Sequence, residues 1–239
     1  MIKEDLYAPI REKYQNLKTA LEGNDLEEMI RLTLDVHAMV HPQTISGAVE
    51  KTIADYVMDY MMSGDHQKQL VPRMNCDISL EYAGTDTVPM CWHFWHIYRI
   101  EDLVSNFLIA DQDQIFDQQW QARMNSPITD TGNALESAEA ADFGDTIDVK
   151  ALQEYMLEVG KNTRKIIADL TLEKIRAKPS EKQLKRIVQE GGLTSDKRSI
   201  WLLDYWGSLT VAGMILTPLT DHHMMHLPPC LDQLPMFKI

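Results

Sequence analysis

The sequence predicts an all-α fold: a bundle of four long helices, with short helices between them and one long irregular loop. Apolar residues recur at helical spacing in several long segments. The apolar–polar alternation that is typical of strands is scarce. The 239 residues include only 11 glycines and 10 prolines, so few residues interrupt the helical pattern.

The first predicted helix follows Asn24-Asp25, a suitable N-cap, and ends at Pro42, because proline cannot continue a helix. One face of this helix carries Leu26, Ile30, Thr33, Leu34, His37 and His41. A shorter helix is expected over 47–62, where Ser63-Gly64 follows. Residues 65–88 are expected to form a loop.

The next helix is expected to begin at Pro89, because the first helical position needs no N–H donor. Its apolar stripe contains Trp92, His93, His96, Ile100, Leu103, Val104 and Phe107, and its opposite face carries Tyr98, Glu101, Asp102 and Ser105. Residues 111–146 are expected to form the long irregular loop.

The second half of the chain predicts three more helices. Residues 148–170 have the clearest amphipathic pattern, and residues 181–190 form a basic helix that ends at Gly191-Gly192. Residues 197–216 form an apolar helix, which Pro218 interrupts just before the sequence DHHMMHL.

Composition excludes several classes of protein. The net charge of −13 argues against nucleic acid as a partner, because phosphate binding needs a concentrated basic face. No apolar run is long enough for a membrane span, and the N-terminus lacks the apolar core of a signal peptide. The cysteines are Cys76, Cys91 and Cys230; their odd number and the lack of a CxxC pair suit a reducing cytoplasm.

Seven of the eight histidines lie in three groups, which are His37/His41, His93/His96 and His222/His223/His226. A spacing of three or four residues places two imidazoles on one side of a helix, where they can bind one metal. The strongest pair is His222 and His226, because both continue an apolar face that begins at Ile215 and Leu219. The alternative is that they are ordinary core or surface histidines.

A third imidazole from a facing helix would complete a metal site with one open position. His96 lies near the centre of its apolar stripe, and periodicity favours it only slightly over His93. The pair His37/His41 indicates either a second metal site, a contact to water near the first, or hydrogen-bonded core histidines. Neither His223 nor His66 is a strong candidate, because the first points away from its neighbours and the second lies in a loop.

The order of the motifs resembles that of the DinB-like family of helical bundles. The matching residues are Trp95-His96-Ile97, Arg99, Glu101-Asp102, Asn106, Thr131-Gly132-Asn133, Asp204-Tyr205-Trp206-Gly207, Ala212-Gly213, Pro218 and His222-x3-His226-Leu227. The helix over 148–170 resembles the third helix of the family's bundle. The resemblance covers roughly 26–234, which predicts a single domain over 1–239.

The resemblance implies a four-helix bundle in which His96, His222 and His226 bind a divalent metal, usually nickel or zinc. It also implies a reaction on a small-molecule substrate, because relatives include transferases and isomerases that use a low-molecular-weight thiol such as bacillithiol or mycothiol. Dimers are common in the family. Two departures concern the site: Asp221 replaces an arginine, and Pro228-Pro229 are expected to end the last helix early.

A divalent metal on three neutral imidazoles is a strong Lewis acid that activates water or a thiol. The sequence therefore predicts a metal-dependent, thiol-dependent transferase or a hydrolase, with His93 or His37 as the candidate general base. One alternative is a non-enzymatic metal-binding or stress-response protein in which the metal braces the bundle. Another is an interaction module without metal that uses Phe94 and Tyr98 on an outward face, unless other segments cover both rings. A ferritin-like di-iron bundle is excluded, because the sequence has no Glu-x-x-His motif.

Overall fold

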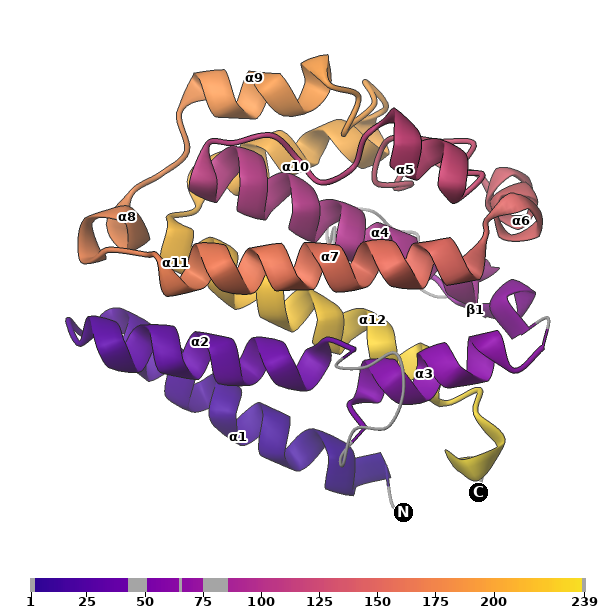
Figure 1. Ribbon diagram of the computed structural model, residues 1–239, viewed down its shortest axis with the longest axis horizontal. Coiled ribbons are helices and arrows are strands. Elements are labelled where there is room, and N and C mark those ends of the chain that lie inside the picture. The colour runs from indigo at the N-terminus through magenta and orange to yellow at the C-terminus, as the bar shows by residue number, and fades with distance from the viewer. Residues whose placement is uncertain (1–2, 43–50, 65, 75–85, 238–239) are drawn as a thin grey trace.

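The computed structural model describes residues 3–42, 51–64, 66–74 and 86–237, and it is mostly helical (Figure 1). The first half contains α1 (Lys3–Glu22), α2 (Leu26–Val40), α3 (Ile53–Met62), η1 (His66–Lys68), β1 (Leu70–Pro72), β2 (Thr87–Pro89), α4 (Met90–Leu103), η2 (Val104–Ala110) and α5 (Gln118–Arg123). The second half contains α6 (Ser137–Thr146), α7 (Val149–Ala168), α8 (Leu172–Arg176), α9 (Glu181–Gln189), α10 (Lys197–Ser208), α11 (Val211–Leu216), η3 (Thr217–Asp221), α12 (His222–Leu231) and η4 (Pro235–Phe237). The all-α prediction is confirmed, whereas the four-helix bundle stays a prediction.

The two short strands β1 and β2 form an antiparallel pair in which Val71 lies opposite Val88. Both valines are fully buried against the start of α4. The strands therefore fix the end of a loop region that the sequence predicted to be without regular structure. Part of that region, like 47–50 of the predicted second helix, lies outside the described residues.

Helix α4 lies at the centre of the fold, and all of its residues are buried. It contacts α6, α7, α12 and η3, while α2 contacts α7 and η3 (Figure 1). Other segments cover the face of α4 opposite its apolar stripe, which is the alternative expected for Phe94 and Tyr98: these two residues, Glu101 and Asp102 all have 0% exposure. A helix covered on all sides is normally apolar all round. The polar side chains of α4 therefore need partners inside the protein.

Some predicted boundaries are corrected. The N-terminal helix α1 was not predicted, and two helices, α5 and α6, lie within the predicted loop 111–146. Helix α5 begins where Asp117 accepts the N–H of Trp120, and α6 begins at a capping box formed by Glu136 and Glu139. The predicted helix 197–216 is two helices, because Thr210 caps a new one, α11.

The last helix, α12, does not end early: Pro228 and Pro229 lie inside it and the helix continues to Leu231. Prolines at these positions remove the N–H groups that would pair with the carbonyls of Met224 and Met225. Both methionines are half-buried rather than fully enclosed, so these carbonyls lie toward the outer side of the helix. The cost of the prolines is therefore lower than in a buried turn.

A wide, π-helical turn, η3, connects α11 to α12 and sets the orientation of the final histidines. Pro218 lies in this turn, and the single hydroxyl proton of Thr220 is shared between the carbonyls of Ile215 and Leu216, both at 2.8 Å. These bonds satisfy acceptors that a widened turn leaves open. The extra residue rotates α12 relative to α11, which changes the side chains that face α4.

Candidate metal centre

Three histidines meet between α4 and α12, as the sequence predicted. Ligand-capable atoms of His96, His222 and His226 all lie within 4.8 Å of one another. Their ring centroids form a nearly equilateral triangle with sides of 4.9, 4.8 and 4.6 Å. The exposed fractions of the three residues are 2%, 4% and 0%, respectively. A group of imidazoles this close and this buried could hold a metal ion.

The tautomer of His96 follows from its hydrogen bond to the backbone. Its Nδ1 lies 2.8 Å from the carbonyl oxygen of Thr131, which can only accept a hydrogen bond. Nδ1 therefore carries the proton in the neutral ring, and the lone pair of Nε2 points toward His222. The Nε2 of His222 lies 3.2 Å away. Either one proton is shared between these nitrogens, or both lone pairs face a cation.

The separation of the two nitrogens fits a shared metal. Two imidazole nitrogens at about 2.0–2.1 Å from a tetrahedral metal are about 3.3 Å apart. The 3.2 Å between Nε2 of His96 and Nε2 of His222 is nearly this value. The three histidines thus fit a divalent transition metal.

Burial keeps the three rings neutral. Burial lowers the pKa of His96 from 6.5 to about 4, although the bond to Thr131 opposes this shift. Burial, together with the neighbouring imidazoles, also holds the pKa values of His222 and His226 well below the usual range. Neutral imidazole is the form that binds metals. The site is therefore ready for a cation without having to release protons at neutral pH.

His93, a candidate general base, lies against one of the candidate ligands. Its Nδ1 is 2.9 Å from Nδ1 of His226, and burial lowers the pKa of His93 to about 3. If His226 bound a metal through Nε2, its Nδ1–H would donate to the neutral His93. This contact would orient the His226 ring, and the role of His93 as a base stays a prediction.

The loop that orients His96 is held by two side chains of α4, Trp92 and Arg99. Trp92 stacks on the His96 ring at a centroid distance of 4.7 Å and donates from Nε1 to the carbonyl of Gly132 at 3.1 Å. Gly132 has a φ of +74°, and a Cβ there would lie 2.8 Å from that indole nitrogen. Arg99 donates to the carbonyl of Thr129 from both Nε (3.0 Å) and Nη2 (2.9 Å). Together these contacts place the carbonyl of Thr131 on His96.

Asp102 anchors Arg99 and the segment that precedes α5. Its carboxylate lies 3.1 Å from Nη1 of Arg99 and accepts the hydroxyl of Tyr155 at 2.7 Å. It also accepts the backbone N–H groups of Ile115 (2.8 Å) and Phe116 (2.9 Å). The Arg-x-Glu-Asp motif therefore contributes a buried ion pair that fixes the loop, rather than a group that contacts the three histidines.

A second buried cluster lies beside the first, around Glu101. Its carboxylate lies 3.0 Å from Nε2 of His37, 2.6 Å from Nε2 of His41 and 2.9 Å from Nε2 of His223. All four side chains have at most 1% exposure. Burial raises the pKa of Glu101, but the adjacent histidines outweigh this effect and hold it well below the usual range. The sequence predicted no metal site for Glu101 or His223. Neither the burial of both sides of α4 nor the wide turn before α12 is apparent from the sequence.

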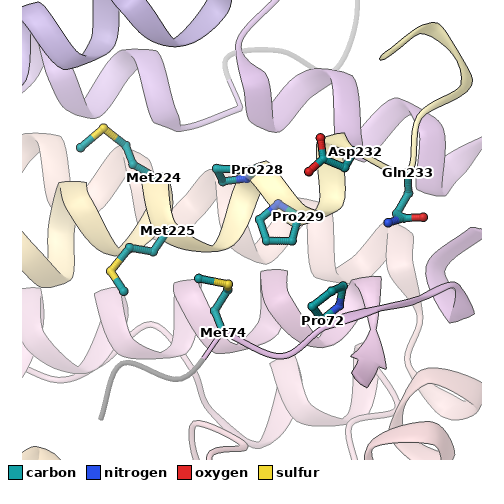
Figure 2. Close-up of a pocket in the computed structure, with 8 residues that line it drawn as sticks. All are labelled: Pro72, Met74, Met224, Met225, Pro228, Pro229, Asp232 and Gln233. Atoms are coloured by element: carbon teal, nitrogen blue, oxygen red, sulfur yellow. The ribbon is translucent and has the colours of Figure 1, made fainter. Parts of the chain in front are cut away.

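A pocket of about 450 Å³ lies on the outer side of α12, and none of the histidines lines it (Figure 2). Its walls are Pro72, Met74, Met224, Met225, Pro228, Pro229, Asp232 and Gln233. Figure 2 shows Met74 and Pro72 on one side of the pocket, opposite Met225 and Pro229 of α12. The pocket and the three histidines are therefore on different sides of the same helix.

Further findings concern the cysteines, membranes and known proteins. Cys91 and Cys230 are free and buried, and burial raises the pKa of the Cys91 thiol to about 12, whereas Cys76 lies outside the described residues.

Within the described ranges, none of the helices has the length and apolar character needed to cross a bilayer. No family model matches the sequence, and no curated protein is similar to it.

Proposed function

We propose that this chain is a divalent-metal-binding protein of the DinB-like kind, a four-helix bundle that binds nickel or zinc through His96, His222 and His226. The observation that carries the proposal is the pair of Nε2 atoms of His96 and His222, 3.2 Å apart with the lone pair of His96 directed at its partner. The convergence of a third imidazole, that of His226, supports the same assignment.

The proposed activity is a metal-dependent transfer of a low-molecular-weight thiol, such as bacillithiol, to a small electrophile, or hydrolysis of a small molecule. A bound divalent metal supplies Lewis acidity, which lowers the pKa of a thiol or of water. The protein orients two of the ligands through backbone and side-chain contacts: Thr131 fixes His96, and His93 fixes His226. An assembly of two chains is part of the proposal, since dimers are common among the proteins that the sequence resembles.

A second candidate function, a metal that only braces the helices, is favoured by the burial of the site. The candidate ligands are at most 4% exposed, and the adjacent pocket does not include them. A structural metal normally has four protein ligands. In an enzyme, in contrast, one coordination position of the metal must exchange with solvent.

Metal analysis of protein purified without a His-tag tests the metal site. We expect His96→Ala and His222→Ala to lose the metal, because each removes one of three ligands. His66→Ala is the matched control, since His66 is stacked on Tyr60 away from both clusters. Retention of the metal by both ligand variants would refute the proposal.

Two assays then separate an enzyme from a braced bundle. Metal-loaded protein is incubated with bacillithiol and a panel of electrophiles, and the loss of free thiol is followed. X-ray absorption spectroscopy of the loaded protein counts the ligand atoms and detects a coordinated water. Thiol consumption that disappears in His222→Ala supports the enzyme, whereas four protein ligands with no exchangeable water support the brace.

A further inference from the structure

The Glu101 cluster contains four side chains that carry metal-ligating atoms, drawn from three different helices. His37 lies in α2 and His41 is the C-cap residue of that helix, whereas Glu101 comes from α4 and His223 from α12. One nitrogen of each of three imidazoles lies within 3.0 Å of a carboxylate oxygen of Glu101. The proposed metal centre uses none of these four residues.

The negative charge of Glu101 must be compensated inside the protein. A buried carboxylate is stable only when it is paired or coordinates a metal. In the described parts of the chain, the ion pairs of Glu101 are all with histidines, which carry a positive charge only when protonated. A divalent cation would compensate the carboxylate while the imidazoles stay neutral.

Ligand-capable atoms of His37, His41 and Glu101 all lie within 4.8 Å of one another, and the His223 ring lies beside this group. His37 and His41 stack with centroids 4.1 Å apart, and His41 lies 5.0 Å from His223. Ring nitrogens of all three, including Nδ1 of each, are buried without hydrogen-bond partners among the described residues. Gly160 on α7 makes room for His41: a Cβ at that position would lie 2.4 Å from Nδ1 of His41.

We propose that His37, His41, His223 and Glu101 form a second metal site, which takes a divalent transition metal such as Zn²⁺. Four protein ligands close the coordination sphere of zinc, and this is the pattern of structural sites. The second site therefore braces α2, α4 and α12, while the three-histidine site keeps a position free. The two sites share α4 and α12, where Glu101 follows His96 by five residues, about 7.5 Å along the helix axis.

The test is the zinc content of the full-length protein after zinc loading and dialysis. We expect two equivalents in the unmodified protein, one in Glu101→Gln and one in His222→Ala. Glu101→Gln keeps the shape of the side chain but removes the charge and one strong ligand oxygen. If the unmodified protein and Glu101→Gln both bind one equivalent, and His222→Ala binds none, the second site is refuted and the proposed function stands. If one equivalent is lost in Glu101→Gln but kept in His222→Ala, the second site stands and the proposed function fails.

A second pair of variants tests the site in case Glu101→Gln misfolds. Neither variant substitutes a proposed ligand residue. Gly160→Ala drives a methyl group into the His41 ring and should remove one zinc equivalent, with a lower thermal unfolding midpoint of the zinc-loaded protein. Gly207→Ala on α10 is the control, because its Cβ would meet only a flexible leucine side chain at 3.1 Å. Two equivalents in both glycine variants, with equal zinc affinity, would overturn the proposal.

Discussion

Replacing Asp102 by alanine should destabilise the protein strongly, because this carboxylate accepts hydrogen bonds from several buried donors. Arg99, Tyr155 and the backbone N–H groups of Ile115 and Phe116 would lose their acceptor. Removing one partner of a buried ion pair costs about 3–5 kcal/mol, and each buried donor without a partner costs about 1–3 kcal/mol. Repacking and entry of water reduce the sum, so we expect a loss of about 4 kcal/mol in the free energy of unfolding.

For a chain of this length, a loss of about 4 kcal/mol corresponds to a fall of roughly 10 °C in the thermal unfolding midpoint. Differential scanning calorimetry of Asp102→Ala measures this shift, and Asp204→Ala, at an exposed position on α10, is the matched control. The double variant Arg99→Met/Asp102→Leu should lose less than the sum of the single changes, since it leaves neither charge unpaired. A midpoint of Asp102→Ala within 2 °C of that of the unmodified protein would refute the role of the ion pair.

The same variant should also weaken metal binding at a distance. The loop held by Arg99 and Asp102 carries Thr131, whose carbonyl fixes the ring of His96. Loss of a group that orients a ligand typically lowers metal affinity about 10–100-fold. Competition with a chromophoric chelator measures the affinity. An unchanged affinity in a folded Asp102→Ala variant would show that the loop does not position the ligand.

Three further predictions concern single features of the site. Gly132→Ala places a Cβ 2.8 Å from Nε1 of Trp92 at a positive φ, and we expect urea unfolding to show a loss of about 1–2 kcal/mol, with Gly207→Ala unchanged or more stable. The metal-free protein should lose stability as the pH falls below 6.5, because the unfolded chain then protonates His96 whereas the folded chain does so only near pH 4. At pH 5 this residue alone accounts for roughly 2 kcal/mol, and a thermal midpoint that does not change between pH 7 and 5 would contradict the prediction. Thr220→Val removes the hydroxyl donor that two carbonyls of α11 share, so its free energy of unfolding should fall by about 1–2 kcal/mol, and equal stability would show that the wide turn does not depend on the hydroxyl.

The candidate ligands could be predicted from the sequence because their pattern is local. His222 and His226 are one helical turn apart on a face that also carries apolar residues, and His96 lies in the middle of an apolar stripe. Their burial in the structure agrees with both patterns. The amphipathic helix over 148–170 was predicted for the same reason, and α7 covers nearly the same residues.

The remaining features depend on contacts that are distant in sequence. The charged residues of α4 lie opposite its apolar stripe, and the sequence alone does not show what covers them. Here Glu101 is paired with histidines of α2 and α12, and Asp102 is paired with Arg99 and with N–H groups of the loop. Glu101 and Asp102 are buried because α6, α7 and α12 pack around α4.

The buried polar residues of α4 also explain why this helix, rather than a more apolar one, carries the candidate site. A helix that is covered on all sides can hold His96 and Glu101 only where partners from other helices meet them. Helix α12 supplies these partners through three histidines within five residues, since the wide turn η3 directs both His222 and His223 toward α4. A cation in each cluster would compensate the cost of removing these groups from water. Without cations, the hydrogen bonds among the imidazoles and Glu101 must offset that cost. The stability of the metal-free protein relative to the loaded one therefore measures how far the interior of this fold depends on metal.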